Sequence, residues 1–109
     1  MKKDPVLKII LKTLDDKKAE AVEVLDVRNL TPLCETYVIA TADNIRKLNA
    51  IKENIVEEIE KSGESIHHVE GREDSGWVLI DAFHIVVHLF SPEQRERIDL
   101  DGLIKKALR

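Results

Sequence analysis

Hydrophobic and polar positions are patterned most clearly between Val69 and Phe90, where two apolar runs flank a short polar break. The first run is Trp77 to Ile80, the second is Ile85 to Phe90, and the break is Asp81 to His84. Two β-rich runs separated by a few polar residues indicate a β-hairpin. We therefore predict a hairpin here and expect the rest of the chain to pack around it.

The two faces of this hairpin differ in chemistry, because successive strand residues point to opposite faces. One face is purely aliphatic and is called the aliphatic face: Val78, Ile80, Ile85, Val87 and Leu89. The mixed face combines an indole, a carboxylate and imidazoles with apolar groups: Trp77, Leu79, Asp81, His84, Val86, His88 and Phe90. We expect helices to bury the aliphatic face, which leaves the mixed face for a partner. A structural interpretation stays open, with Trp77 a half-buried core residue and His88 a hydrogen-bonded core histidine.

The other elements follow from helical and strand spacing. Amphipathic helices are predicted at Asp4 to Lys17, Asn44 to Ser62 and Leu100 to Leu108, with a short helical turn at Ser91-Pro92. Further strands are predicted at Ala21 to Val27, Thr36 to Thr41 and Ser65 to Glu70. The order predicts one α/β domain over residues 1–109, with helices packed on a mixed sheet of about five strands.

Composition and charge narrow the range of partners. The chain has 109 residues, of which 43% are hydrophobic and 35% charged, as in an ordinary folded domain. Its net charge is -4 and it has no basic run, so it is poorly suited to bind the phosphate backbone of a nucleic acid. A basic protein surface would be a better partner.

Cysteine usage and hydropathy bear on location. Cys34 is the only cysteine and cannot form an intrachain disulfide, so we expect a small buried residue. No apolar run reaches the length of a membrane span. The start, Met1 to Pro5, with Lys8 and Lys12 soon after, does not make a signal peptide. We expect a cytoplasmic protein.

Histidine spacing gives no support for a metal site. His84 and His88 share a face of the predicted strand but lie four residues apart, roughly 13 Å at about 3.3 Å per residue. That separation is too long for one ion to bind both nitrogens. His67 and His68 are adjacent, so we expect them to point to opposite faces. The sequence therefore predicts no metal.

Motifs for cofactors and catalysis are also absent from the sequence. The glycine pair Gly71 and Gly76 encloses Glu73 and Asp74, whose carboxylates would repel a phosphate. There is no GxGxxG, no GxxxxGK[ST] and no Gly-x-Ser-x-Gly motif. We predict neither a cofactor nor an enzymatic reaction.

Several runs occur in an order that is specific to one family. They are Glu35 to Thr41, Glu70-Gly71, Trp77 to Asp81, Ile85 to Phe90 and Ser91 to Arg95. Together they resemble the signature of the ribosomal silencing factor family, also called RsfS or Iojap, over nearly the whole chain. Four positions depart from the family pattern: Thr36 replaces a tyrosine, Ala42 a glycine, and Ile98 and Ile104 an aromatic pair.

This resemblance implies a function. Members of such a family would bind the large ribosomal subunit through its ribosomal protein fourteen (uL family), on the surface that meets the small subunit. They would thereby block subunit joining and lower translation when nutrients are scarce. The resemblance also implies a fold similar to a nucleotidyltransferase core without its catalytic carboxylates, no cofactor, and a homodimer when free.

The resemblance and the residue pattern together assign roles on and beside the mixed face. Trp77 is the predicted anchor and Leu79 and Val86 its apolar surround, because buried aromatic side chains dominate many interfaces. Glu70 and Asp81 are predicted to accept hydrogen bonds from lysine or arginine of the partner, and His88 to donate one. Two alternatives stay open: a nucleotidyltransferase-like enzyme acting on a small substrate, and a mixed face that serves only as a homodimer interface.

Overall fold

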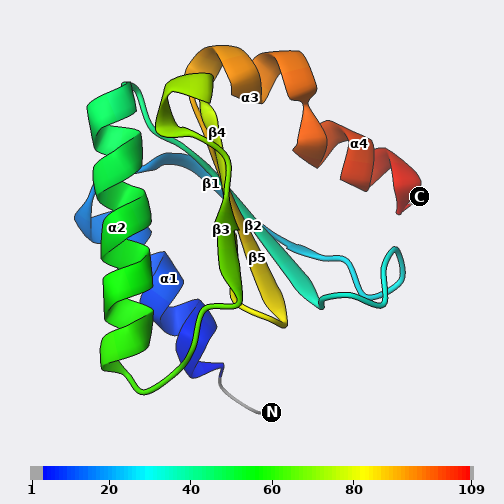
Figure 1. Ribbon diagram of the computed structural model, residues 1–109. Helices are drawn as coiled ribbons and strands as arrows, with labels where there is room; N and C mark the ends of the chain where they lie inside the picture. The colour runs from blue at the N-terminus through cyan, green and yellow to red at the C-terminus, as the bar shows by residue number, and fades with distance from the viewer. Residues whose placement is uncertain (1–3, 109) are drawn as a thin grey trace.

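The computed structural model describes residues 4–108, the side chain of Glu73 excepted (Figure 1). Its helices are α1 (Pro5–Asp16), α2 (Ile45–Lys61), α3 (Pro92–Ile98) and α4 (Leu100–Ala107), with a 3-10 turn, η1, at Glu73–Ser75. Its strands are β1 (Glu20–Asp26), β2 (Thr36–Thr41), β3 (His68–Glu70), β4 (Trp77–Asp81) and β5 (Ile85–Phe90). The predicted elements are confirmed, with two differences: β3 is shorter than expected, and Ser91-Pro92 begins a helix of 7 residues. Residues 1–3, part of the segment tested for a signal peptide, lie outside the described chain.

The strands form one mixed sheet in the order β1-β2-β5-β4-β3. β2 and β5 run parallel in the middle, and the other neighbours are antiparallel. The predicted hairpin is confirmed, because Trp77 lies opposite Phe90 and Asp81 opposite Val86 in the β4–β5 ladder. The expected five-stranded mixed sheet of an α/β domain is therefore present.

Local sequence signals fix where the helices begin. The Asp4 carboxylate accepts hydrogen bonds from the backbone N–H groups of Val6 and Leu7, both at 3.1 Å, and Pro5 occupies the first helical position of α1. Asn44 caps α2 and Ser91 caps α3 in the same way. These caps satisfy N–H groups that have no partner inside the helix.

The aliphatic face is buried as predicted. Helices α1 and α2 lie side by side on this face of the sheet (Figure 1). They contribute fully buried leucine and isoleucine side chains: Ile10, Leu14, Leu48, Ile51, Ile55 and Ile59. These pack against the aliphatic face and against Val38 and Ala40 of β2. This layer is the main hydrophobic core.

A candidate docking surface on the mixed face

The strand register extends the mixed face across the sheet. Leu79 lies opposite His88, and Ile39 of β2 pairs with His88 from the other side. Tyr37 of β2 pairs with Val86, and Leu25 of β1 lies opposite Tyr37. Cross-strand neighbours share a face, so an apolar surface runs from β1 to β4 with imidazole, indole and phenol groups set into it.

Helices α3 and α4 cover part of this face, which corrects the expectation that the whole of it is left for a partner. Ile98, Leu100 and Ile104 pack against a second core cluster made of Val27, Cys34, Ile39, Val86 and Phe90. The two helices lie across the sheet from α1 and α2 (Figure 1). Helix α4 is amphipathic, and its Ile104 is buried against this face, whereas Ile98 and Leu100 are half-buried. Cys34 is buried, as expected, and burial raises the pKa of its thiol.

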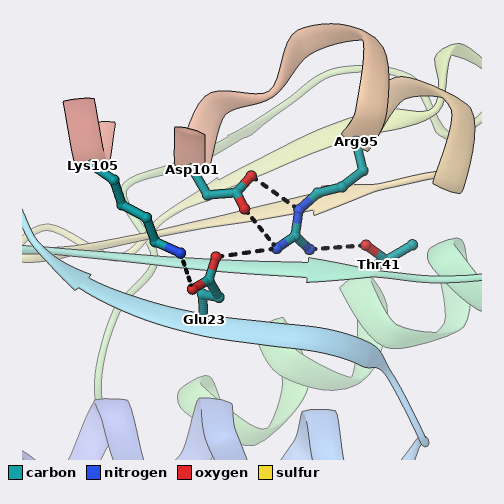
Figure 2. A network of polar contacts seen from close by, with 5 residues as sticks. All are labelled: Glu23, Thr41, Arg95, Asp101 and Lys105. Atoms are coloured by element: carbon teal, nitrogen blue, oxygen red, sulfur yellow. Dashed lines mark hydrogen bonds and ion pairs between the residues drawn. The ribbon is translucent and has the colours of Figure 1, made fainter. Parts of the chain in front are cut away.

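A polar network holds α3 and α4 against β1 and β2. The Arg95 guanidinium on α3 donates from Nε and Nη2 to the two Asp101 carboxylate oxygens, at 3.2 and 3.3 Å, and from Nη1 to Thr41 Oγ1 at 2.9 Å. Glu23 lies 3.7 Å from Arg95 Nη2 and accepts a 2.6 Å hydrogen bond from Lys105 Nζ (Figure 2). Because the network sits at the β1 side of the sheet, the helices leave the β4 side less covered.

The electrostatics of this network follow from partial burial. The Arg95 side chain is 13% exposed and the Asp101 side chain 18%. Burial alone would raise the pKa of Asp101, but the hydrogen bonds and charge of Arg95, together with further hydrogen bonds, outweigh it and hold that pKa below its usual range. Asp101 is therefore ionised under ordinary conditions and pairs with the guanidinium.

Trp77 is positioned by groups beneath it. Its indole stacks on Phe90 with ring centroids 5.2 Å apart, and its Nε1–H donates to His88 Nδ1 at 3.3 Å. His88 is 3% exposed, and among the described residues its Nε2 has no hydrogen-bond partner. Burial lowers the pKa of His88 to about 4, so the imidazole is neutral near pH 7 and carries its proton on Nε2. Part of the structural interpretation therefore holds: Trp77 is half-buried and His88 lies in the core.

Next to Trp77 the surface is hollowed, with a volume of about 540 Å³. Residues of β3, β4, η1 and α3, together with Gly71 after β3, line this docking hollow: Glu70, Gly71, Ser75, Trp77, Leu79, Gln94, Arg97 and Ile98. Its walls include apolar groups, and among the side chains that the structure describes its charged groups are one acid, Glu70, and one base, Arg97. The hollow is thus an apolar depression with charges of both signs.

One glycine sets how closely the backbone approaches the hollow. Gly71 has a φ of +93°, and a Cβ at this position would overlap the Trp77 carbonyl oxygen. The backbone conformation favours glycine, and the contact leaves no room for a Cβ. Gly71 therefore lets the chain after β3 lie directly against the start of β4.

The structure brings together three of the six predicted site residues. Glu70, Trp77 and Leu79 line the docking hollow, whereas Asp81 lies farther along β4, beside the His68 side chain. Val86 and His88 lie under the surface, 9% and 3% exposed. In this position His88 supports Trp77 from below, and Val86 belongs to the second core cluster.

Two expectations about histidines need correction. His67 and His68 do not diverge: their ring centroids are 5.0 Å apart, because β3 begins at His68 and strand alternation does not extend to His67. His84 lies in the turn before β5, where its Nε2 is 2.8 Å from the Asp4 carboxylate at the start of α1. His84 is therefore engaged with α1 and takes no part in the docking hollow.

Sequence patterning missed the contribution of α3. Gln94, Arg97 and Ile98 line the docking hollow, yet only the cap and proline at Ser91-Pro92 indicated a helix there. The spacing of Gln94 and Arg97, three residues apart, places both on one side of a helix, and Arg97 Nε donates to Gln94 Oε1 at 3.1 Å. That spacing could have suggested that Gln94 and Arg97 share a role, but it could not show that both side chains line the docking hollow.

The fold and the hollow define an α/β domain that offers a surface for binding. The chain belongs to the RsfS family, described as ribosomal silencing factor during starvation, whose model matches residues 1–109. This is a family of translation regulators and not of enzymes. No helix in the described part of the chain is long and apolar enough to cross a membrane.

Individual relatives agree with this assignment. The ribosomal silencing factor RsfS of Chromobacterium violaceum is 32% identical over 98 residues, which cover 90% of this chain and 80% of that protein. The chloroplastic protein Iojap of Arabidopsis thaliana is 29% identical over 92% of this chain, which corresponds to 42% of that longer protein. A crystal structure of a Chromobacterium violaceum protein superposes with a TM-score of 0.89 at 30% identity, covering 96% of this chain and 88% of that one. The predicted family is confirmed.

Proposed function

We propose that this protein represses translation by binding the large ribosomal subunit through its ribosomal protein fourteen. By occupying the surface that meets the small subunit, it blocks subunit joining when nutrients are limiting. Family membership supports the ribosome as the target. The observation that carries the proposal is the docking hollow, because it presents a half-buried Trp77 on the face that α3 and α4 leave partly open.

Within this proposal Trp77 is the anchor and Leu79 its apolar neighbour. A central tryptophan in a desolvated pocket is a frequent source of binding energy at interfaces. Trp77 is held in place by Phe90 and His88, so little side-chain freedom is lost on binding. Val86 and His88 then contribute from beneath, by packing and by orienting the indole.

Charge supports a basic partner. The chain carries a net charge of -4, which favours encounter with a basic protein. Glu70, whose side chain is 65% exposed, and Asp81 are the acceptors we assign to partner lysine or arginine side chains. Arg97 adds a donor that could meet a backbone carbonyl or an acid of the partner.

The direct test is sedimentation of the full chain with separated ribosomal subunits. We expect it to co-migrate with the large subunit only and to reduce the light scattering that follows mixing of the two subunits. Co-migration with the small subunit, or unchanged subunit joining at saturating protein, would contradict the proposal.

We also infer that the sheet is a nucleotidyltransferase-like core used for binding, and that the free protein is a cytoplasmic homodimer. A nucleotide present at a hundred times its dissociation constant would add about 2.7 kcal/mol to the free energy of unfolding. Thermal unfolding with nucleotides and Mg²⁺ therefore distinguishes a nucleotide-binding enzyme from a protein that only docks on a partner. We expect no shift. Sedimentation equilibrium tests the dimer, and adding large subunits shows whether dimer and ribosome compete for the mixed face.

A further inference from the structure

A cluster of two histidines and one aspartate lies at the other end of β3 and β4 from η1. His68 is the residue opposite Asp81 in the β3–β4 ladder, and the backbone N–H of His67 donates to the Asp81 carbonyl at 2.8 Å. One ligand atom from each of these three side chains lies within 4.8 Å of the others. The ladder itself therefore holds the three side chains together.

We propose that His67, His68 and Asp81 bind a divalent transition-metal ion, with Zn²⁺ the best match. Two imidazole nitrogens and a carboxylate oxygen are a common donor set for zinc, and imidazole discriminates against Mg²⁺ and Ca²⁺. This inference does not rest on the proposed ribosomal function, but a bound ion would occupy the Asp81 carboxylate that the proposed function assigns to a partner side chain.

The distances are close to those of a zinc site. In tetrahedral zinc, ligand atoms about 2.0–2.1 Å from the metal lie roughly 3.3 Å from one another. His68 Nδ1 and Asp81 Oδ2 are 3.8 Å apart. The histidines are exposed and Asp81 is half-buried, so small side-chain rotations close the remaining gap.

Neighbouring groups orient these side chains as in known metal sites. Glu70 Oε2 lies 3.0 Å from His68 Nε2, which favours a proton on Nε2 and leaves the Nδ1 lone pair facing Asp81. Histidine ligands of metals usually donate their second ring N–H to such a carboxylate. Asp81 Oδ1 accepts the backbone N–H of Phe83 at 2.9 Å, which leaves Oδ2 for an ion.

The remaining histidine of the cluster is positioned by aromatic contacts. The His67 ring lies 5.3 Å from the Phe83 ring and meets His68 edge-on. Three protein ligands leave a fourth tetrahedral position for water or for a side chain of a partner. Glu70 contacts His68 and also lines the docking hollow, so one side chain connects the cluster with that hollow.

Titration calorimetry of the full chain with ZnCl₂ at pH 7.5 tests the proposal. We expect one equivalent to bind, and expect His68→Ala and Asp81→Asn each to weaken the affinity at least tenfold. Asp81→Asn keeps an oxygen for the Phe83 N–H, so the turn is retained. The matched control is His84→Ala, which removes one imidazole outside the cluster and should leave zinc affinity within twofold.

Co²⁺ provides a second readout that does not depend on stability. Wild type should give the intense visible absorption of a four-coordinate site, and His67→Ala should lose it. Far-UV circular dichroism of each variant checks that the fold is retained. The proposal fails if wild type binds no equivalent of zinc, if His84→Ala loses as much affinity as His68→Ala, or if Asp81→Asn binds as tightly as wild type.

Discussion

The two faces of the sheet are made by the same strands but are covered differently. The aliphatic face lies under two long helices and contains only apolar side chains that are almost fully buried. The mixed face lies under two short helices held by one polar network, with Trp77 and Leu79 half-buried beside them. We therefore expect the aliphatic face to supply most of the stability, whereas the mixed face leaves Trp77 and Leu79 partly exposed, as the binding role that we propose requires.

The largest expected effect tests the aliphatic face. Ile80→Ala should lower the free energy of unfolding by about 4 kcal/mol, because Ile80 is fully buried and its truncation leaves a cavity. The matched control is the adjacent Leu79→Ala, which should cost about 1 kcal/mol because Leu79 is half-buried on the mixed face. Urea unfolding measures both. Equal losses would mean that the two faces contribute alike.

The second prediction concerns His88 and pH. Its pKa of about 4 in the folded state lies below the value of 6.5 expected for the unfolded chain, so the unfolded state binds more protons below pH 6.5. The contribution of the neutral His88 imidazole to the free energy of unfolding is complete above pH 6.5. It falls as the pH drops and is lost near pH 4, which lowers the free energy of unfolding by up to about 3 kcal/mol.

His88→Gln is the control for that prediction, since glutamine can still accept the Trp77 N–H but does not titrate. Unfolding free energies measured between pH 4 and 7 should be flatter in this variant than in wild type. Parallel curves would show that His88 is not the group that titrates.

The third prediction concerns the polar network that fixes α3 and α4 to the sheet. Arg95→Met should cost about 2 kcal/mol, because Asp101 and Glu23 lose their shared cation while they remain partly buried. Arg97→Met, on the exposed side of the same helix, should change stability by less than about 0.5 kcal/mol. Adding Asp101→Asn to Arg95→Met should recover part of the loss. No difference between the two arginine variants in urea unfolding would show that the network is dispensable.

The fourth prediction addresses binding. Trp77→Ala should weaken association with the large subunit roughly thirtyfold, equivalent to about 2 kcal/mol. Trp77→Phe keeps an aromatic ring over Phe90 and should weaken it less. Quantitative sedimentation with large subunits measures both variants. A folded Trp77→Ala protein that binds as tightly as wild type would refute the anchor, and one that loses only dimerisation would favour the homodimer interface.

The sequence predicted the parts of the fold that depend on local pattern. Alternation identified the β4–β5 hairpin and its two faces, and Asp4, Asn44 and Ser91 marked the helix starts because caps are local chemistry. The candidate site was predicted only in part. Trp77, Leu79 and Glu70 share the docking hollow, but the burial of His88 and Val86 depends on where α3 and α4 pack, which no local pattern encodes.

The position where β3 begins explains the error at His67 and His68. Strand alternation applies inside a ladder, and β3 begins three residues later than predicted, at His68 and not at Ser65. Because β3 begins at His68, the His67 ring can turn toward its neighbour. Short edge strands are the elements whose limits are hardest to read from sequence.

The close backbone contact at Gly71 affects how mutational data on this protein are interpreted. The carbonyl of Trp77 occupies the space that any larger residue at position 71 would need, so a substitution there would push two backbone segments apart. A variant at this position could lose ribosome association although no atom of residue 71 had touched the partner. The width of the docking hollow depends on the spacing of the main chain at Gly71 and Trp77. A mutational scan that considers side-chain contacts alone would attribute the lost association to a lost contact with the partner.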